Sequence, residues 1–211
     1  WFSKLMTYLH EYSFVVSKQS SFMDLAIIFK TDQFMLKNQI ELFAENDYNF
    51  AGRPPLQADF IYKINNKQIS IINLHMKCCD SGLNRRKMAS KMLYEYLNNI
   101  YETQSNIIVL GDWNDDTKDH DGEHCFEPFF NDERFYFTTK KLAMDISKAS
   151  YPKEPYLSFL DHILISKKLL PPNSNYFVDT INMGKYMGGY EIYDTYISDH
   201  LPVLLSFSVT N

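Results

Sequence analysis

The chain contains, at residues 107–115, the sequence Ile-Ile-Val-Leu-Gly-Asp-Trp-Asn-Asp. Its first four residues are all aliphatic, which is typical of a short strand buried on both faces. Polar residues begin where that strand is expected to stop. Asp112 and Asn114 are two positions apart, so on an extended segment their side chains point the same way. The stretch therefore predicts a buried strand that presents a carboxylate and an amide together at its end.

Three further segments place polar side chains beside an apolar strand. They are Asn73-Leu74-His75, Leu160-Asp161-His162-Ile163 and Ser198-Asp199-His200-Leu201-Pro202. Each segment alone is weak evidence for a catalytic site. An Asp such as Asp112 is most often a turn or capping residue, and a His at a strand end, such as His75, is structural as often as it is functional. Together, the four segments predict one site to which several strands contribute.

The hydrophobic pattern predicts many strands and few helices. Helices are expected over residues 1–9 and 84–101, and strands over residues 14–16, 25–29, 34–43, 60–64, 69–75, 107–110, 161–166 and 203–209. Strands 60–64 and 69–75 form an antiparallel hairpin that ends at His75, and residues 184–193 form a long Gly- and Tyr-rich loop. This order predicts an α/β fold of two packed sheets flanked by helices, with all 211 residues (1–211) in a single domain.

Composition excludes several classes of protein. With 45% hydrophobic and 22% charged residues the chain is a folded protein rather than a disordered one, and no apolar run approaches the roughly 20 residues of a membrane span. The three cysteines, Cys78, Cys79 and Cys125, match neither a disulfide framework nor a paired zinc motif. A net charge of -5 gives no global positive field, so a polyanionic substrate needs a local basic patch. The compartment and the oligomeric state stay open.

The four segments, in this order and spacing, resemble the endonuclease/exonuclease/phosphatase superfamily, which includes DNase I-like nucleases, sphingomyelinases and inositol-polyphosphate phosphatases. The resemblance covers the chain from Tyr12 onward and includes Arg53-Pro54-Pro55 ahead of the hairpin. It implies a four-layer α/β sandwich of two mainly antiparallel sheets with helices outside. This is the architecture that the hydrophobic pattern predicts independently.

The resemblance also implies a role for each polar residue. Asp112 matches the aspartate that orients or deprotonates the attacking water, and Asn114 the partner that holds water and phosphate. His200 matches the imidazole that contacts the phosphoryl oxygen, and Asp161 the carboxylate that fixes its tautomer and charge. His75 resembles the second histidine, which binds phosphate or protonates the leaving oxygen.

The implied cofactor is Mg²⁺ or Mn²⁺, since hard cations prefer carboxylate and amide oxygens. The expected metal residues are Asp112, Asn114 and Asp199. One family feature is missing: members open with a strand bearing a Trp-Asn pair, and a later strand ends in the principal metal-binding Glu. Here Trp1 is followed by Phe2, and no Glu ahead of Phe14 lies at the end of a strand. We therefore expect an amino-terminally truncated domain that lacks the first strands.

The predicted function is metal-dependent hydrolysis of a phosphodiester, with nucleic acid as the expected substrate. A phosphomonoesterase or a sphingomyelinase-like lipid phosphodiesterase uses the same core residues, and a binding module without catalysis is the alternative from another class. Two further features stay open. Arg53 and residues 85–87 either grip phosphate or form a solvated charged surface, and Tyr186, Tyr190, Tyr193 and Tyr196 either stack on bases or pack locally. The acidic stretch 119–124 is expected to be a solvated loop.

Overall fold

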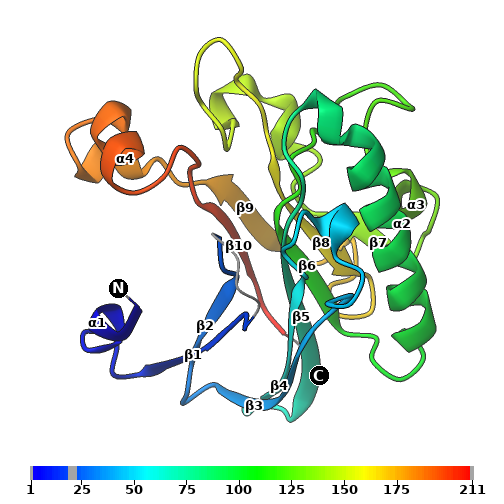
Figure 1. Cartoon of the computed structure of the whole chain (residues 1–211). Coiled ribbons are helices and arrows are strands. Elements are labelled where there is room, and N and C mark those ends of the chain that lie inside the picture. Colours follow the sequence, from blue (N-terminus) through cyan, green and yellow to red (C-terminus); the bar gives the residue numbers. More distant parts are fainter. Residues whose placement is uncertain (1, 19–22, 210–211) are drawn as a thin grey trace.

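A six-stranded sheet forms the centre of the fold in this computed structural model, which describes residues 2–18 and 23–209 (Figure 1). The strand order is β3-β4-β5-β6-β8-β7, and only β5 and β6 are parallel. The strands are β3 (Phe34–Glu41), β4 (Leu56–Tyr62), β5 (Lys67–His75), β6 (Ile107–Asp112), β7 (Phe135–Phe137) and β8 (Asp161–Ser166). The parallel pair requires a crossover, which is supplied by helix α2 (Leu83–Ile100).

Helix α2 covers one face of this sheet, with α3 (Glu127–Phe130) beside it (Figure 1). The apolar stripe of α2 packs on alternate residues of the central strands, which point to the same face. This main core contains Ala89, Leu93 and Leu97 from the helix and Ile72, Leu74, Ile107, Val109 and Leu164 from the strands. The remaining strand residues, including His75 and Asp112, face the opposite side.

The opposite face is covered by two separate ribbons (Figure 1). One pairs β1 (Tyr12–Val16) with β2 (Ala26–Lys30), and the other pairs β9 (Tyr176–Thr180) with β10 (Val203–Phe207). Val15 and Ile27 pack on β4 through Leu56 and Phe60, while Leu205 packs near Ile69 on β5. The predicted sandwich is confirmed, although its second β layer consists of two ribbons among the described residues.

The predicted strands and the predicted helix at α2 are present in the structure, whereas several other segments differ from the prediction. Residues 184–193 are not a loop: they contain a 3₁₀ turn, η5 (Met183–Tyr186), and the start of helix α4 (Tyr190–Tyr196). Strands β7 and β9 and helix α3 were not predicted. The first helix, α1, spans Phe2–Met6, and Trp1 lies outside the described residues.

The remaining 3₁₀ turns are η1 (Tyr48–Phe50), η2 (Asp80–Gly82), η3 (Leu142–Met144) and η4 (Ile146–Lys148). Among the described residues, no helix is both long and apolar enough to cross a bilayer.

The end of β6 is fixed by its neighbours. Trp113 is fully buried, lies edge-on to Phe129 and Phe137, and donates from Nε1 to the His162 carbonyl at 3.2 Å. Gly111 has a φ of 132°, and a Cβ at this position would lie 2.0 Å from the Leu74 carbonyl oxygen. Only glycine therefore allows β6 to approach β5 closely enough at this point.

Gly111→Ala is expected to destabilise the fold by about 1–3 kcal/mol more than Gly122→Ala. Gly122 is a matched control, since it also has a positive φ (85°) but a Cβ added there would have no neighbouring atom within 4 Å. Urea unfolding of the two variants measures the difference. Equal destabilisation would contradict a steric requirement for glycine between β5 and β6.

His162 is a buried histidine whose protonation state follows from its partners. Its side chain is fully buried against Phe126, Phe137 and Phe159. Nε2 lies 3.1 Å from the Asp115 carbonyl, which can only accept, so Nε2 carries the proton and Nδ1 accepts from Thr139 at 3.0 Å. Burial lowers the pKa of His162 to about 4, despite the nearby charges of Asp116 and Asp161.

This lowered pKa predicts a loss of stability in acid. The unfolded chain binds a proton at His162 near pH 6.5, whereas the folded protein does so only near pH 4, so the free energy of unfolding falls as pH drops between these values. The loss is on the order of 3 kcal/mol. Urea unfolding of wild type and His162→Gln from pH 7 to pH 4 measures it, since Gln keeps a donor toward Asp115 but does not titrate. An equal acid loss in both proteins would contradict the assignment.

Candidate active site

The strand register brings three of the predicted residues side by side. His75 pairs with Asp112 across the parallel strands β5 and β6, and Asp112 pairs with Asp161 across the antiparallel strands β6 and β8. Residues opposite each other on neighbouring strands point to the same face of a sheet. His75 Nε2 accordingly lies 3.2 Å from Asp112 Oδ2. Two strands end and one begins at this row, so it lies at one edge of the sheet.

Asn114 is held against Asp112. Its backbone N–H donates to Asp112 Oδ1 at 2.8 Å, and its side-chain Nδ2 donates to Oδ2 at 2.7 Å. Nδ2 also donates to the Met76 carbonyl at 3.1 Å. Because both partners are acceptors, the amide must turn its nitrogen toward them. A φ of 53° at Asn114, in the left-handed region that Asn tolerates, produces this tight turn.

His200 completes the group from a separate loop. Its Nδ1 lies 2.6 Å from Asp161 Oδ2, which leaves Nε2 for another partner. The imidazole and the carboxylate are both partly exposed, with 22% of each side chain accessible in this pair. The arrangement is that of a carboxylate orienting an imidazole, as in a catalytic triad.

The loop that carries His200 is fixed by hydroxyl groups. Tyr193, on α4, donates to the His200 carbonyl at 3.0 Å, and Tyr190 donates to the Asp199 carbonyl at 2.7 Å. The Ser198 hydroxyl accepts from the His200 N–H at 3.0 Å. Helix α4, predicted as a loop, is thus the element that positions His200, and two of the four candidate stacking tyrosines pack locally.

Charges in this group alter each other's protonation. Burial, and then repulsion from Asp161, raises the pKa of Asp112 to about 7. Burial also lowers the pKa of His75 to about 4, with the charges of Arg53 and His200 acting in the same direction. His75 is therefore neutral at pH 7, so its 3.2 Å contact with Asp112 is not an ion pair. For His200, burial opposes the charged form, but the hydrogen bond and charge of Asp161, with Asp112 and Asp199, raise its pKa to about 9.

The group also has the composition of a cation site. One ligand atom from each of Asp112, Asp161 and His200 lies within 4.8 Å of the others. A bound divalent cation would relieve the repulsion between the two carboxylates, which after burial contributes to the raised pKa of Asp112. Two carboxylates and a neighbouring amide offer oxygen atoms, which hard divalent cations prefer as ligands.

Of the three predicted metal residues, two lie in the polar group and the third, Asp199, lies outside it. Asp112 and Asn114 are in direct contact, whereas the side chain of Asp199 is exposed and does not belong to the close group. Its charge still acts on both His75 and His200, so it lies nearby. The assignment of Asp199 as a metal ligand stays a prediction.

Two arginines have roles that the sequence did not reveal. Arg53 is half-buried and donates from Nη2 to the Met76 carbonyl at 2.7 Å, and its charge acts on Asp112. Arg86 is buried and forms an ion pair with Asp115 at 3.1 Å, so it is not part of a solvated surface. Arg85 instead lies over the ring of Tyr48. Of the acidic stretch 119–124, residues 119–123 are exposed as expected, but His124 is buried.

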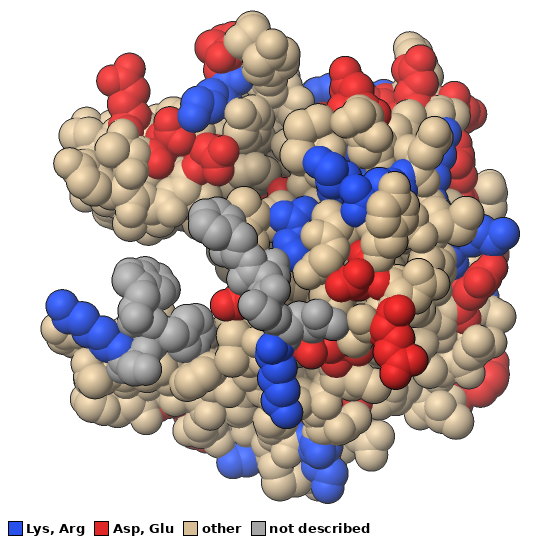
Figure 2. All heavy atoms as spheres, in the orientation of Figure 1, with Lys and Arg blue, Asp and Glu red and all other residues tan. Residues whose placement is uncertain are grey.

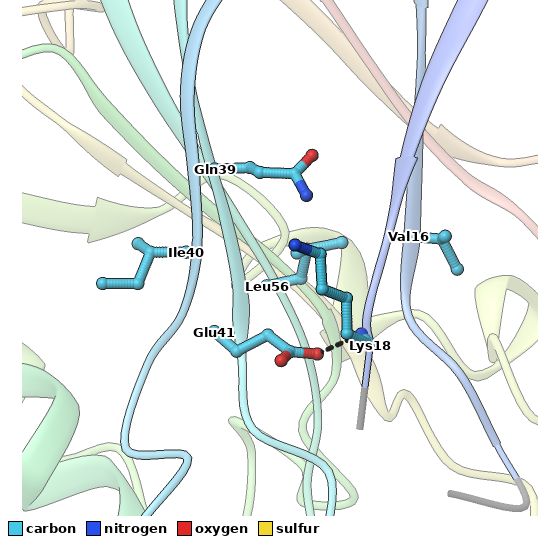
Figure 3. A pocket seen from close by; sticks show the side chains of 6 residues that line it. All are labelled: Val16, Lys18, Gln39, Ile40, Glu41 and Leu56. Atoms are coloured by element: carbon cyan, nitrogen blue, oxygen red, sulfur yellow. Dashed lines mark hydrogen bonds between the residues drawn. The ribbon is translucent and has the colours of Figure 1, made fainter. Parts of the chain in front are cut away.

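A small pocket lies apart from these residues, between β1, β3 and β4 (Figure 3). It is lined by Val16, Lys18, Gln39, Ile40, Glu41 and Leu56. In Figure 3 the side chains of Lys18 and Glu41 lie together, where the Lys18 backbone N–H donates to the Glu41 carboxylate. None of its six residues is a predicted site residue, and it adds no group to the cluster.

Solved structures with the same fold support this description. Human Nocturnin, in its catalytic domain with bound sulfate, has a TM-score of 0.68 and 19% identity, covering 99% of this chain and 76% of that one. D. rerio TDP2, complexed with a single-strand DNA product, has a TM-score of 0.72 and 17% identity, covering 99% and 81%. The Bacteroides thetaiotaomicron mannosyl-6-phosphatase Bt3783 has a TM-score of 0.62 and 19% identity, covering 97% and 80%. No curated protein sequence matches the chain.

The fold is that of the DNase I-like class, which these structures share. The family model for the endonuclease/exonuclease/phosphatase family matches residues 3–208. The chain belongs to that family.

The Asp161–His200 pair gives a test of the electrostatics that does not depend on activity. In the metal-free protein, Asp161→Asn is expected to lower the pKa of His200 from about 9 by more than one unit, because it removes the largest favourable charge. NMR titration of the imidazole measures this shift. Asp199→Asn is the matched control and should lower the pKa less, since Asp199 acts by charge alone. An unchanged His200 pKa in Asp161→Asn would contradict the pairing.

Proposed function

We propose that the protein is a divalent-metal-dependent phosphodiesterase that hydrolyses nucleic acid by attack of water on phosphorus. The observation that carries this proposal is the contact of two histidines, His75 and His200, with the carboxylates of Asp112 and Asp161 at one sheet edge. Such a group offers a base, a charged donor and a cation site within a few ångströms, which are the parts that phosphoryl transfer requires.

Each residue takes a role that fits its place in the site. Asp112, at the end of β6, orients and deprotonates the attacking water, and Asn114 holds Asp112 in place. His200 is protonated at neutral pH, so its free Nε2–H donates a charge-assisted hydrogen bond to a phosphoryl oxygen, while Asp161 fixes the tautomer. His75 is neutral there, which favours phosphate binding over protonation of the leaving oxygen.

The proposed cofactor is Mg²⁺ or Mn²⁺. Asp112, Asn114 and Asp199 are the proposed metal residues, and the carboxylate of Asp161 is close enough to Asp112 to share in the site. When bound, such an ion polarises the phosphoryl oxygen and neutralises charge that develops on phosphorus.

Nucleic acid is the favoured substrate for two reasons. TDP2, which shares the fold, is described in complex with a single-strand DNA product. In addition, Tyr186 on η5 and Tyr196 on α4 are 79% and 75% exposed, and exposed aromatic rings can stack on bases. Figure 2 shows Lys and Arg mixed with Asp and Glu on the face in view rather than gathered in one large basic surface. This pattern favours a substrate that is gripped at the site over a tight, non-specific duplex binder.

A phosphomonoesterase is the second candidate, because the sugar-phosphate enzyme Bt3783 has the same fold. The chemistry of the proposed residues is common to both substrates, and the loops decide between them.

Substitution of Asp112 or His200 by Ala is expected to lower turnover at least about 100-fold while leaving the fold intact, because each removes a group that acts on the reacting phosphate. Asp121→Asn is the control, since the Asp121 side chain is fully exposed and away from the cluster. Circular dichroism checks folding, and initial rates measure turnover. Substantial activity in either Ala variant would overturn the residue assignment.

Removal of the metal is expected to abolish hydrolysis reversibly. The complete gene product is assayed on single-stranded DNA, abasic duplex, RNA, a phosphomonoester and sphingomyelin, with Mg²⁺ or Mn²⁺ and with chelator. Cleavage of DNA or RNA that chelator stops supports the proposal. Cleavage of the monoester alone would assign the second candidate, and activity that survives chelation would refute metal dependence.

A further inference from the structure

The three cysteines lie in two different environments. Cys125 is fully buried in the main core, whereas Cys78 is half-buried and Cys79 is exposed. The Sγ atoms of Cys78 and Cys79 lie 2.9 Å apart. The surface therefore carries two neighbouring thiols in contact, in the short loop 76–79 that follows His75.

This loop is joined to the candidate active site through backbone carbonyls. The Met76 carbonyl accepts from Arg53 Nη2 at 2.7 Å and from Asn114 Nδ2 at 3.1 Å. The Met76 N–H donates to the Asp112 carbonyl at 2.8 Å. A shift of the loop would thus reach the residues that hold Asp112.

The other end of the loop is held by Arg86. Its Nη1 donates to the carbonyls of Lys77 and Cys79, at 3.0 and 2.7 Å, while its other nitrogens bind Asp115. The Gly82 N–H also donates to the Cys79 carbonyl at 2.9 Å. Cys79 has φ 71° and ψ 164°, a conformation that residues with a Cβ rarely adopt. These bonds to its carbonyl hold the strained residue in place.

The surroundings of Cys78 favour reaction with an oxidant. Lys77 Nζ lies 3.4 Å from its Sγ. The pKa of the Cys78 thiol is lowered by the hydrogen bond from Cys79 and by the hydrogen bond and charge of Lys77, although burial acts in the opposite direction. The pKa of the Cys79 thiol is raised. A thiolate next to a second, accessible thiol is the arrangement in which oxidation ends in a disulfide.

We propose that Cys78 and Cys79 form a site of reversible oxidation, at which a peroxide closes a disulfide between the two neighbours and loosens loop 76–79. The Cys78 thiolate attacks one oxygen of hydrogen peroxide, which breaks the O–O bond, gives the sulfenic acid and releases hydroxide. The Cys79 thiol then gives up its proton and attacks Cys78 Sγ, so that the S–S bond forms and the hydroxyl leaves as water. Two thiols and one peroxide yield one disulfide and two waters.

Closing this bond requires the backbone to move. Adjacent Cα atoms are about 3.8 Å apart, below the usual range of about 4.4–6.8 Å for a disulfide. The ring closed across this short distance is strained, so the backbone torsions beside the 78–79 peptide must change, including the φ of Cys79. Cys79 is the residue whose carbonyl accepts from Arg86 and from the Gly82 N–H, so a change in its conformation weakens these bonds. A bond made under this strain is readily reduced again, which makes the modification reversible.

The test measures the oxidation state of the two cysteines and the motion of loop 76–79 rather than turnover. Its outcome is therefore independent of the proposed function. Brief treatment with a low excess of hydrogen peroxide should lower the intact mass by two hydrogen atoms, and peptide mapping should place the disulfide between Cys78 and Cys79. Dithiothreitol should restore the starting mass. Hydrogen-deuterium exchange of the peptide that contains Met76 and Gly82 should become at least about fivefold faster on oxidation.

Cys79→Ser and the buried Cys125 are the matched controls. After peroxide, Cys79→Ser should form no intramolecular disulfide and should keep the exchange rate of the untreated protein, and Cys125 should remain free to alkylation after denaturation. Lys77→Gln should slow the oxidation severalfold. Oxidation of Cys78 to sulfinic acid without a disulfide, or a disulfide that leaves exchange of this peptide unchanged, would overturn the proposal.

Discussion

The register of β5, β6 and β8 determines where the polar groups of this protein meet. It places His75, Asp112 and Asp161 opposite one another, and a slip of one residue on any of the three strands would turn a side chain to the α2 face. Gly111 permits the close approach of β5 and β6, and the buried Trp113 ends β6 on the helix side. The apolar packing beneath α2 and the polar group on the opposite face therefore depend on the same strand pairing.

Electrostatic effects in the group follow from this enforced proximity. Two carboxylates on adjacent strands repel each other, and the protein compensates with His200, brought in on the loop that α4 holds. The result is a set of neighbours with separated pKa values: a carboxyl near 7, a neutral imidazole and a protonated one. Separation of this kind is what acid–base and electrostatic catalysis at neutral pH require.

Much of the sheet and of the polar group at its edge was predictable from the sequence, because hydrophobic periodicity indicates which residues face a core. The strands around Ile107–Asp112 and the helix that precedes them were predicted correctly, as was the arrival of His75 at a strand end. Helix α4 was not predicted, because it is stabilised by tertiary contacts of Tyr190 and Tyr193 with the backbone of Asp199 and His200. The burial of Arg86 was also missed, because its partner Asp115 is far away in sequence and no local pattern marks it.

The central claim is that one phosphate and one divalent cation bind together at this sheet edge. A crystal structure of the protein soaked with Mn²⁺ and inorganic phosphate, with anomalous diffraction to locate the manganese, tests it most directly. We predict manganese at coordination distance, about 2.0–2.3 Å, from a carboxylate oxygen of Asp112, and phosphate in contact with His75 and His200. Manganese and phosphate bound elsewhere, with Asp112 and His200 contacting neither, would contradict the claim.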